Sequence, residues 1–190
     1  MKHLKENRIL RQEALGLLKD KWGIAVSIST VFLFINILSS KVPFSLFFMV
    51  PITIGVINFY LNFSRGHILE MSSIFKYFNN RYLVYIWTSL VMLVRIVLWT
   101  LLLIIPGIIA ALSYSQTYFI LTENNSVSSI EAIEKSKEIM YGHKWKFFLL
   151  LLSFFGWGIL SILTLGIGFL WLIPYMYVTQ AKFYDQIKHG

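Results

Sequence analysis

The sequence contains no cysteine, and its 190 residues include only nine aspartate and glutamate side chains. The lack of cysteine excludes disulfides, thiolate catalysis and cysteine-ligated metal sites. Charged residues make up 14% of the chain, roughly half of the usual share of about 25% in soluble domains. Hydrophobic residues instead reach 57%, and the mean hydropathy is +0.67. A water-soluble globule would expose too much of this apolar surface, so the composition indicates an integral membrane protein.

The longest apolar run covers residues 145–184 and carries charge only at Lys146 and Lys182. A bilayer core takes about 20 apolar residues per helix, so this run predicts two spans joined by a turn over residues 164–168. Other apolar runs predict four more spans. We therefore expect an all-α, polytopic membrane protein with six transmembrane helices arranged as three hairpins. The other spans are expected at residues 23–38, 44–63, 82–105 and 108–122, with a turn at Pro106 and Gly107.

Each predicted hairpin follows a shorter segment with one apolar face, at residues 1–21, 71–80 and 128–141. We expect these segments to be amphipathic helices lying along the cytoplasmic surface of the membrane. The third has the clearest start, because Ser128 and Glu131 have the spacing of a capping box. The expected apolar faces are Leu10, Ala14, Leu17 and Leu18 in the first segment, Ile74, Phe75 and Phe78 in the second, and Val127, Ile130, Ile133, Met140 and Tyr141 in the third.

This order suggests a single membrane domain over residues 1–190 that uses one unit three times, at 1–66, 67–125 and 126–190. The returning spans share an aromatic pair near their ends, at residues 59–60, 118–119 and 183–184. The alternative is that any six-span protein with short outer turns looks periodic.

Basic residues predict the orientation. Of the 17 lysine and arginine residues, Lys41 alone falls on one side, Arg95 falls inside a span, and all others fall on the side of the two termini. Because positive charge concentrates on the cytoplasmic side, both termini are expected in the cytoplasm. Topology and attraction to anionic lipids then explain the net charge of +8 without nucleic-acid binding.

Several runs resemble the bacterial integral membrane family called domain of unknown function 975. They are IIPGIIAALSYSQTYFILTENN from Ile104, EAIEKSKEIMYGHKWKFFLLLLSFFGWGILSILTLGIGFLWLIPY from Glu131, and AKFYDQI from Ala181. A more distant similarity, in helix order only, is to the membrane domain of some bacterial glycerophosphodiester phosphodiesterases. The resemblance implies a membrane fold and transfers no catalytic residue.

Arg95 is the strongest candidate for a functional residue, because a charge inside a span costs about 2.5 to 3.5 kcal/mol on insertion scales. No aspartate or glutamate lies inside any predicted span. We therefore expect Arg95 to meet either neutral polar groups or a lipid phosphate, which would make an anion or headgroup site. The candidate neutral partners are Asn36, Asn58, Ser113 and Gln116. The alternative is that Arg95 extends to the outer interface. The polar block at residues 113–118 either lines a wet cavity or forms interhelical hydrogen bonds.

Catalysis is not expected. The histidines are scattered without metal-ligand spacing, no paired carboxylates reach a common membrane depth, and no phosphate-binding loop is present. We therefore predict no enzyme, cofactor or metal site. The first functional hypothesis is a non-catalytic accessory or scaffold module of the bacterial envelope, with a membrane-protein partner. The alternative is a small transporter or an amphiphile-binding protein that uses Arg95 and the polar fourth span.

Overall fold

The computed structural model describes residues 5–39, 46–67, 70–78, 81–124 and 126–188. These residues form helices joined by short turns, and none of the described residues lies in a strand. The helices are α1 (Asn7–Leu18), α2 (Trp22–Ser39), α3 (Leu46–Ser64), the 3-10 helix η1 (Met71–Tyr77), α4 (Tyr82–Leu102), α5 (Ile104–Tyr114), α6 (Thr117–Glu123), α7 (Ser129–Ile139), α8 (Lys144–Leu163) and α9 (Phe169–Lys188).

Within the described residues, five helical stretches are long and apolar enough to cross a membrane, which confirms the all-α class and indicates membrane insertion. The expected sixth span, α9, has 20 residues but is not among these five. Its second half carries Lys182, Asp185 and Lys188, which lower its apolar content. The five stretches are Trp22–Ser39, Phe47–Ser64, Tyr82–Leu101, Ile104–Glu123 and Lys144–Leu163.

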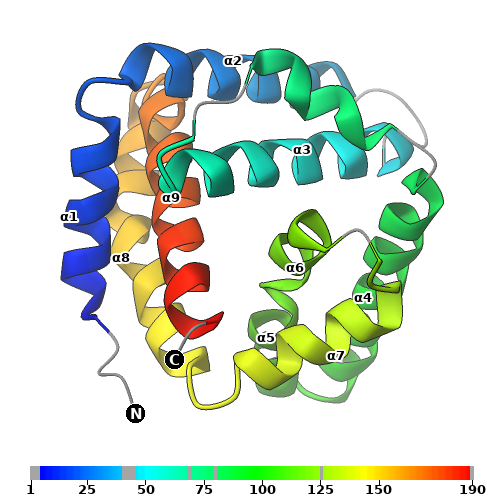
Figure 1. Cartoon of the computed structure of the whole chain (residues 1–190). Coiled ribbons are helices and arrows are strands. Elements are labelled where there is room, and N and C mark those ends of the chain that lie inside the picture. The colour runs from blue at the N-terminus through cyan, green and yellow to red at the C-terminus, as the bar shows by residue number, and fades with distance from the viewer. Residues whose placement is uncertain (1–4, 40–45, 68–69, 79–80, 125, 189–190) are drawn as a thin grey trace.

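The helices differ in how much of each is buried inside the protein. Within the apolar stretches, 67% of Phe47–Ser64 and 50% of Ile104–Glu123 are buried. The corresponding shares are 17% for the stretch in α2, 11% for that in α4 and 22% for that in α8. The helices α3, α6 and α9 therefore form the interior, as Figure 1 shows, while α2, α4 and α8 expose apolar side chains around it.

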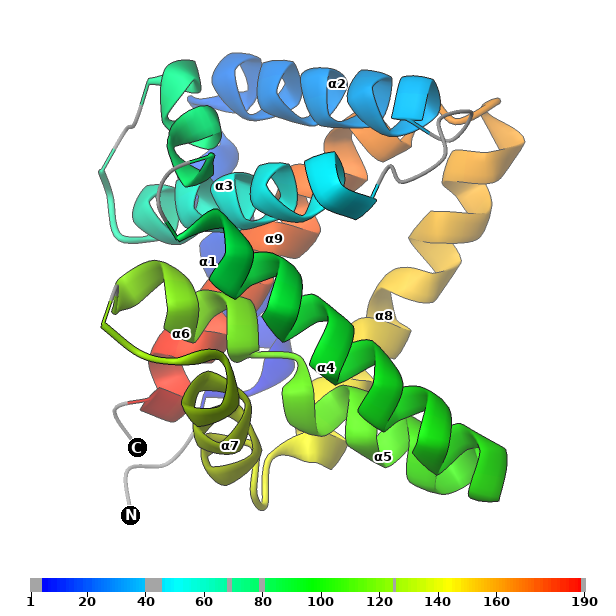
Figure 2. The same ribbon diagram turned by 90° about the vertical axis from the view of Figure 1, so that its right-hand side faces the viewer.

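The ends of the helices fall on two sides of the molecule. In Figure 2, the α4–α5 and α8–α9 junctions lie on the right, whereas α6, α7 and the C-terminal end lie on the left. The α8–α9 junction matches the turn predicted at residues 164–168, because α8 ends at Leu163 and α9 begins at Phe169.

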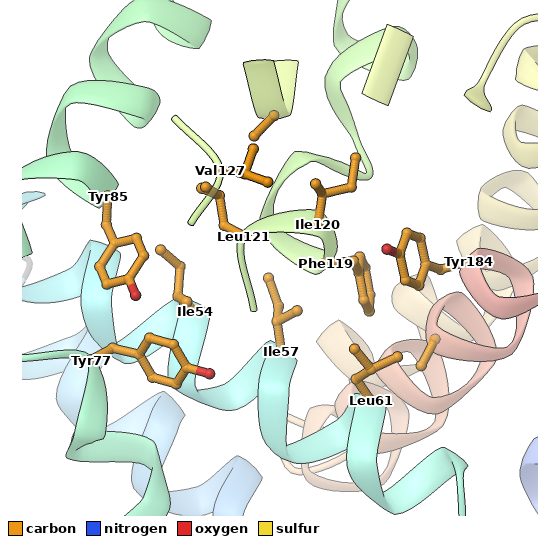
Figure 3. Packing of buried hydrophobic residues seen from close by; sticks show 12 residues of the cluster. Ile54, Ile57, Leu61, Tyr77, Tyr85, Phe119, Ile120, Leu121, Val127 and Tyr184 are labelled. Carbon is orange, nitrogen blue, oxygen red and sulfur yellow. The ribbon is translucent and has the colours of Figure 1, made fainter. Parts of the chain in front are cut away.

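The main core lies between α3 and α6. Figure 3 shows Ile57 and Leu61 of α3 facing Phe119 of α6. Tyr184 of α9 stacks on Phe119, with 5.2 Å between the ring centroids. Buried aromatic rings remove large apolar areas from solvent and add a specific ring geometry. Members of the aromatic pairs noted in the sequence thus join α6 to α9, although the threefold repeat itself stays a prediction.

Two junctions are closed by a glycine that contacts the preceding helix. A Cβ atom added to Gly107 would lie 2.9 Å from the Cα atom of Thr100, and one added to Gly168 would lie 2.8 Å from the Cα atom of Ser161. In each case the glycine follows its partner by seven residues. No larger residue fits without moving the backbone, so these glycines allow α4 and α5, and α8 and α9, to pack closely.

The predicted course of the third and fourth spans is wrong in two places. Helix α4 ends at Leu102, and α5 begins at Ile104, so Pro106 and Gly107 lie inside the first turn of α5 rather than in a connecting turn. Proline is tolerated there because the first turn of a helix has no intrahelical acceptor for its N–H groups. The fourth span is also broken at Ser115 and Gln116, where α5 ends and α6 has not begun.

The predicted apolar face of residues 71–80 is also wrong, and residues 79–80 lie outside the described part of the chain. Ile74 is buried, but Phe75 and Phe78 are 51% and 43% exposed. The reason is that η1 has three residues per turn, so Ile74 and Tyr77 share its buried face. In α1 the predicted Leu10, Ala14 and Leu18 are buried.

The third amphipathic helix keeps its predicted start and only part of its predicted face. The Ser128 side chain accepts a hydrogen bond from the backbone N–H of Glu131 at 3.3 Å, as a capping residue does. Of the predicted apolar face, three members are buried and two are exposed. Buried are Val127, Ile133 and Met140, while Ile130 and Tyr141 are exposed.

Candidate functional site

The densest group of charges joins the ends of the three interior helices. Arg65 directly follows α3, Glu123 ends α6, and Asp185 and Lys188 lie in the last turns of α9. The Arg65 guanidinium bonds Asp185, with Nε 3.1 Å from Oδ1, and also pairs with Glu123. Glu123 further accepts hydrogen bonds from the Tyr184 hydroxyl at 2.5 Å and the Lys188 Nζ at 2.7 Å. We call these five residues the ionic cluster.

The ionic cluster is partly shielded from solvent. The Glu123 side chain is 14% exposed and that of Asp185 is 23% exposed, so their charges interact more strongly than those of a surface pair. The hydrogen bonds to Asp185 raise the pKa of the Arg65 guanidinium, against the opposing effect of its desolvation. The cluster therefore stays charged and fastens α3, α6 and α9 together.

A second polar group holds the break between α5 and α6. The Ser136 hydroxyl of α7 donates to the backbone carbonyl of Ser113 at 2.8 Å and accepts from the backbone N–H of Gln116 at 3.2 Å. The Gln116 amide also donates to the Ser115 hydroxyl at 3.0 Å. Its side-chain oxygen is buried and has no hydrogen-bond partner. The Ser136 hydroxyl of α7 thus replaces hydrogen bonds that the backbone groups of Ser113 and Gln116 would make in a continuous helix.

The expectation of neutral partners for Arg95 is wrong. Arg95 Nη1 donates to Glu134 Oε1 at 2.8 Å, and the two side chains are 33% and 51% exposed. The carboxylate comes from α7, which packs along both α4 and α5. Glu134 lies outside every predicted span, so this contact could not be predicted from the sequence and is seen only in the tertiary structure. Arg95 therefore neither meets the polar groups of the fourth span nor extends away from α7.

The four predicted site residues do not form one site. Ser113 and Gln116 meet at the break, and Arg95 contacts the same helix, α7, through Glu134. Asn58 lies on α3, where its side-chain oxygen accepts a hydrogen bond from Asn62 at 3.2 Å. The sequence reasoning missed the ionic cluster. Its available signal was that Arg65, Glu123 and Asp185 each follow the end of a predicted returning span.

The Arg95–Glu134 pair is expected to contribute little to stability. In a double-mutant cycle of Arg95→Gln and Glu134→Gln, we expect a coupling energy of about 0.5 kcal/mol, because both side chains are about a third or more exposed. The measurement is the free energy of unfolding of the four proteins in mixed detergent micelles. A coupling above about 2 kcal/mol would mean that the pair is desolvated in the membrane, contrary to this account.

These arrangements fasten helices to one another. Among the residues that the structure describes, no group of three or more histidine, aspartate or glutamate side chains is placed to hold a metal ion.

The fold and the site define the class: an all-helical protein with several apolar helices suited to a membrane and polar clusters that join their ends. The chain belongs to the family described as Protein of unknown function (DUF975), whose model matches residues 9–190. This confirms the resemblance found in the sequence. No curated protein and no solved structure matches the chain, so the more distant similarity to glycerophosphodiester phosphodiesterases has no support.

Proposed function

We propose that this protein is a non-catalytic accessory module of the bacterial cytoplasmic membrane. The observation that carries the proposal is the ionic cluster, in which each charged group is bonded to another member. Here the chain uses its most concentrated ionisable groups to hold three helices at one end.

The proposal includes six spans, with α9 as the sixth, and both termini in the cytoplasm. Two observations support it. With six spans, all lysine and arginine residues of the sequence except Lys41 and Arg95 fall on the side of the termini. The α4–α5 and α8–α9 junctions share the opposite side of the molecule in Figure 2. Burial of α9 against α1, α2 and α3 compensates for its lower apolar content, because its polar end meets the ionic cluster rather than lipid.

The partner proposed for this module is a second membrane protein that contacts α7. The inner face of α7 is fixed through Ser136. Tyr141, 83% exposed, lies in the turn that follows α7, and Trp145, 69% exposed, lies at the start of α8. Exposed aromatic residues are enriched in protein interfaces. Charges of both signs beside them, Glu131, Lys135 and Glu138, line a shallow depression and supply polar specificity.

The proposal predicts a stoichiometric complex that depends on α7. The protein is purified from its native membranes in mild detergent, and native mass spectrometry determines the composition of the complex. We expect one membrane protein in a fixed molar ratio, lost on Tyr141→Ser and retained on Arg8→Gln. Arg8 is an exposed residue of α1 and serves as the control. A protein that is always recovered alone, or a partner indifferent to Tyr141→Ser, would contradict the proposal.

The broken fourth span favours transport as a second candidate. Transporters build substrate sites at discontinuous helices, where backbone groups are released from helical hydrogen bonding. Here Gln116 lies at the break, with its side-chain oxygen buried and unpartnered. If the protein transports a polar solute, Gln116→Leu should abolish uptake into vesicles while leaving the protein folded. Uptake unchanged by Gln116→Leu would exclude this site.

A further inference from the structure

A groove between the α1–α2 corner and the α8–α9 hairpin has a volume of about 430 Å³. Three of the six tryptophans of the chain contribute to it, together with leucine and tyrosine side chains. Its walls are almost wholly apolar, and Trp157 and Trp171 are 57% and 48% exposed at its edge. Among its lining residues are Leu15, Trp22, Trp157, Trp171, Leu172 and Tyr175.

Arg11 lies beside this groove without an anionic partner. It is one helical turn before Leu15, on the same face of α1, and its guanidinium lies near the Tyr175 side chain. Its side chain is half-buried, and its Nε atom is shielded from solvent without a hydrogen-bond partner. No described residue forms an ion pair with it, and the nearby Glu13 is paired with Lys5. A half-buried guanidinium without an anion is costly, so this position favours a bound anion.

We propose that the groove and Arg11 bind one anionic phospholipid. The phosphate would bond the Arg11 guanidinium, whose planar donors match phosphate oxygens, and an acyl chain would occupy the apolar groove. The relative placement fits this ligand. The groove extends from Leu15 of α1 to Gly168 at the α8–α9 junction, so a chain would run from the headgroup end toward that junction.

The site is independent of the accessory role proposed above and uses none of its residues. A general attraction of the basic surface to anionic lipid would involve exposed cations such as Arg8 equally. A specific phospholipid site in the groove requires Arg11 in particular. This difference provides the test, because Arg8 and Arg11 lie on the same helix and carry the same charge.

The experiment measures quenching of tryptophan fluorescence by lipids with brominated acyl chains, added to the full-length protein in detergent micelles. We expect saturable quenching by phosphatidylglycerol and about tenfold weaker apparent affinity for phosphatidylcholine, which lacks net charge. Arg11→Gln should reduce the phosphatidylglycerol affinity to the phosphatidylcholine level, and Arg8→Gln should leave it within about twofold. Arg11→Lys, which keeps the charge, should retain intermediate affinity and shows that the loss is not due to unfolding.

A second comparison locates the acyl chain. The double variant Trp157→Phe, Trp171→Phe should lose most of the quenchable fluorescence, whereas Trp87→Phe should keep it. Trp87 is also exposed, at 56%, but it lies on α4 outside the groove. Equal affinity for the two lipids, equal effects of Arg8→Gln and Arg11→Gln, or quenching that survives the double variant would each overturn the proposal.

Discussion

Glu123→Gln is expected to lower the free energy of unfolding by about 2 kcal/mol. The neutral amide cannot compensate the charges of Arg65 and Lys188, and it weakens the hydrogen bond from the Tyr184 hydroxyl. Glu123 is largely shielded from solvent, so water replaces these contacts poorly. Loss of the ion pair with Lys188 contributes the smaller part of this destabilisation, because the Lys188 side chain is more than a third exposed.

The measurement is unfolding in mixed micelles with increasing denaturing detergent, followed by circular dichroism. Glu138→Gln makes the same chemical change at an exposed position of α7 and should alter the free energy by less than about 0.5 kcal/mol. Combining Glu123→Gln with Tyr184→Phe should cost less than the sum of the two single changes, since they remove one hydrogen bond. Equal effects of Glu123→Gln and Glu138→Gln would show that the ionic cluster does not hold the helix ends together.

Gly55→Ala should destabilise the protein by about 1 to 3 kcal/mol, even though alanine favours helices more than glycine does. A Cβ atom at position 55 would lie 2.1 Å from the carbonyl oxygen of Ile74 and 2.8 Å from its Cα atom. These are backbone atoms of η1, so no side-chain rotation relieves the overlap. Helix η1 must move away from α3, and Ile74 then leaves the core that it shares with Val56 and Phe59.

Gly16→Ala provides the matched control for this prediction. Gly16 also lies inside a helix, α1, but a Cβ atom there would have no neighbour within 4 Å. The alanine should therefore stabilise the protein by up to about 1 kcal/mol through helix propensity alone. The two substitutions are expected to have opposite signs in thermal unfolding followed by circular dichroism. A stabilising Gly55→Ala would mean that η1 does not pack on α3 as described.

Hydrophobic periodicity predicted the helical class because a bilayer requires long apolar helices whose backbone groups are bonded internally. The turn after Leu163 and the capping role of Ser128 followed in the same way, since each depends on residues adjacent in sequence. Predictions from local sequence patterns were wrong where one sequence was compatible with two helix geometries. The segment starting at Met71 forms a 3-10 helix, and the polar block breaks the fourth span at Gln116.

The sequence by itself determined that this protein is helical and apolar, because composition and hydrophobic period depend on the solvent in which the helices are stable. Its family followed from the resemblance of particular runs of residues, which the family model confirms. The tertiary structure alone decided which polar groups meet. Glu134 reaches Arg95 from 39 residues away, and Asp185 reaches Arg65 from 120 residues away. Such contacts depend on how helices pack and not on the spacing of residues along the chain. For the same reason, only the tertiary structure placed Arg11 beside an apolar groove, where no described residue forms an ion pair with it.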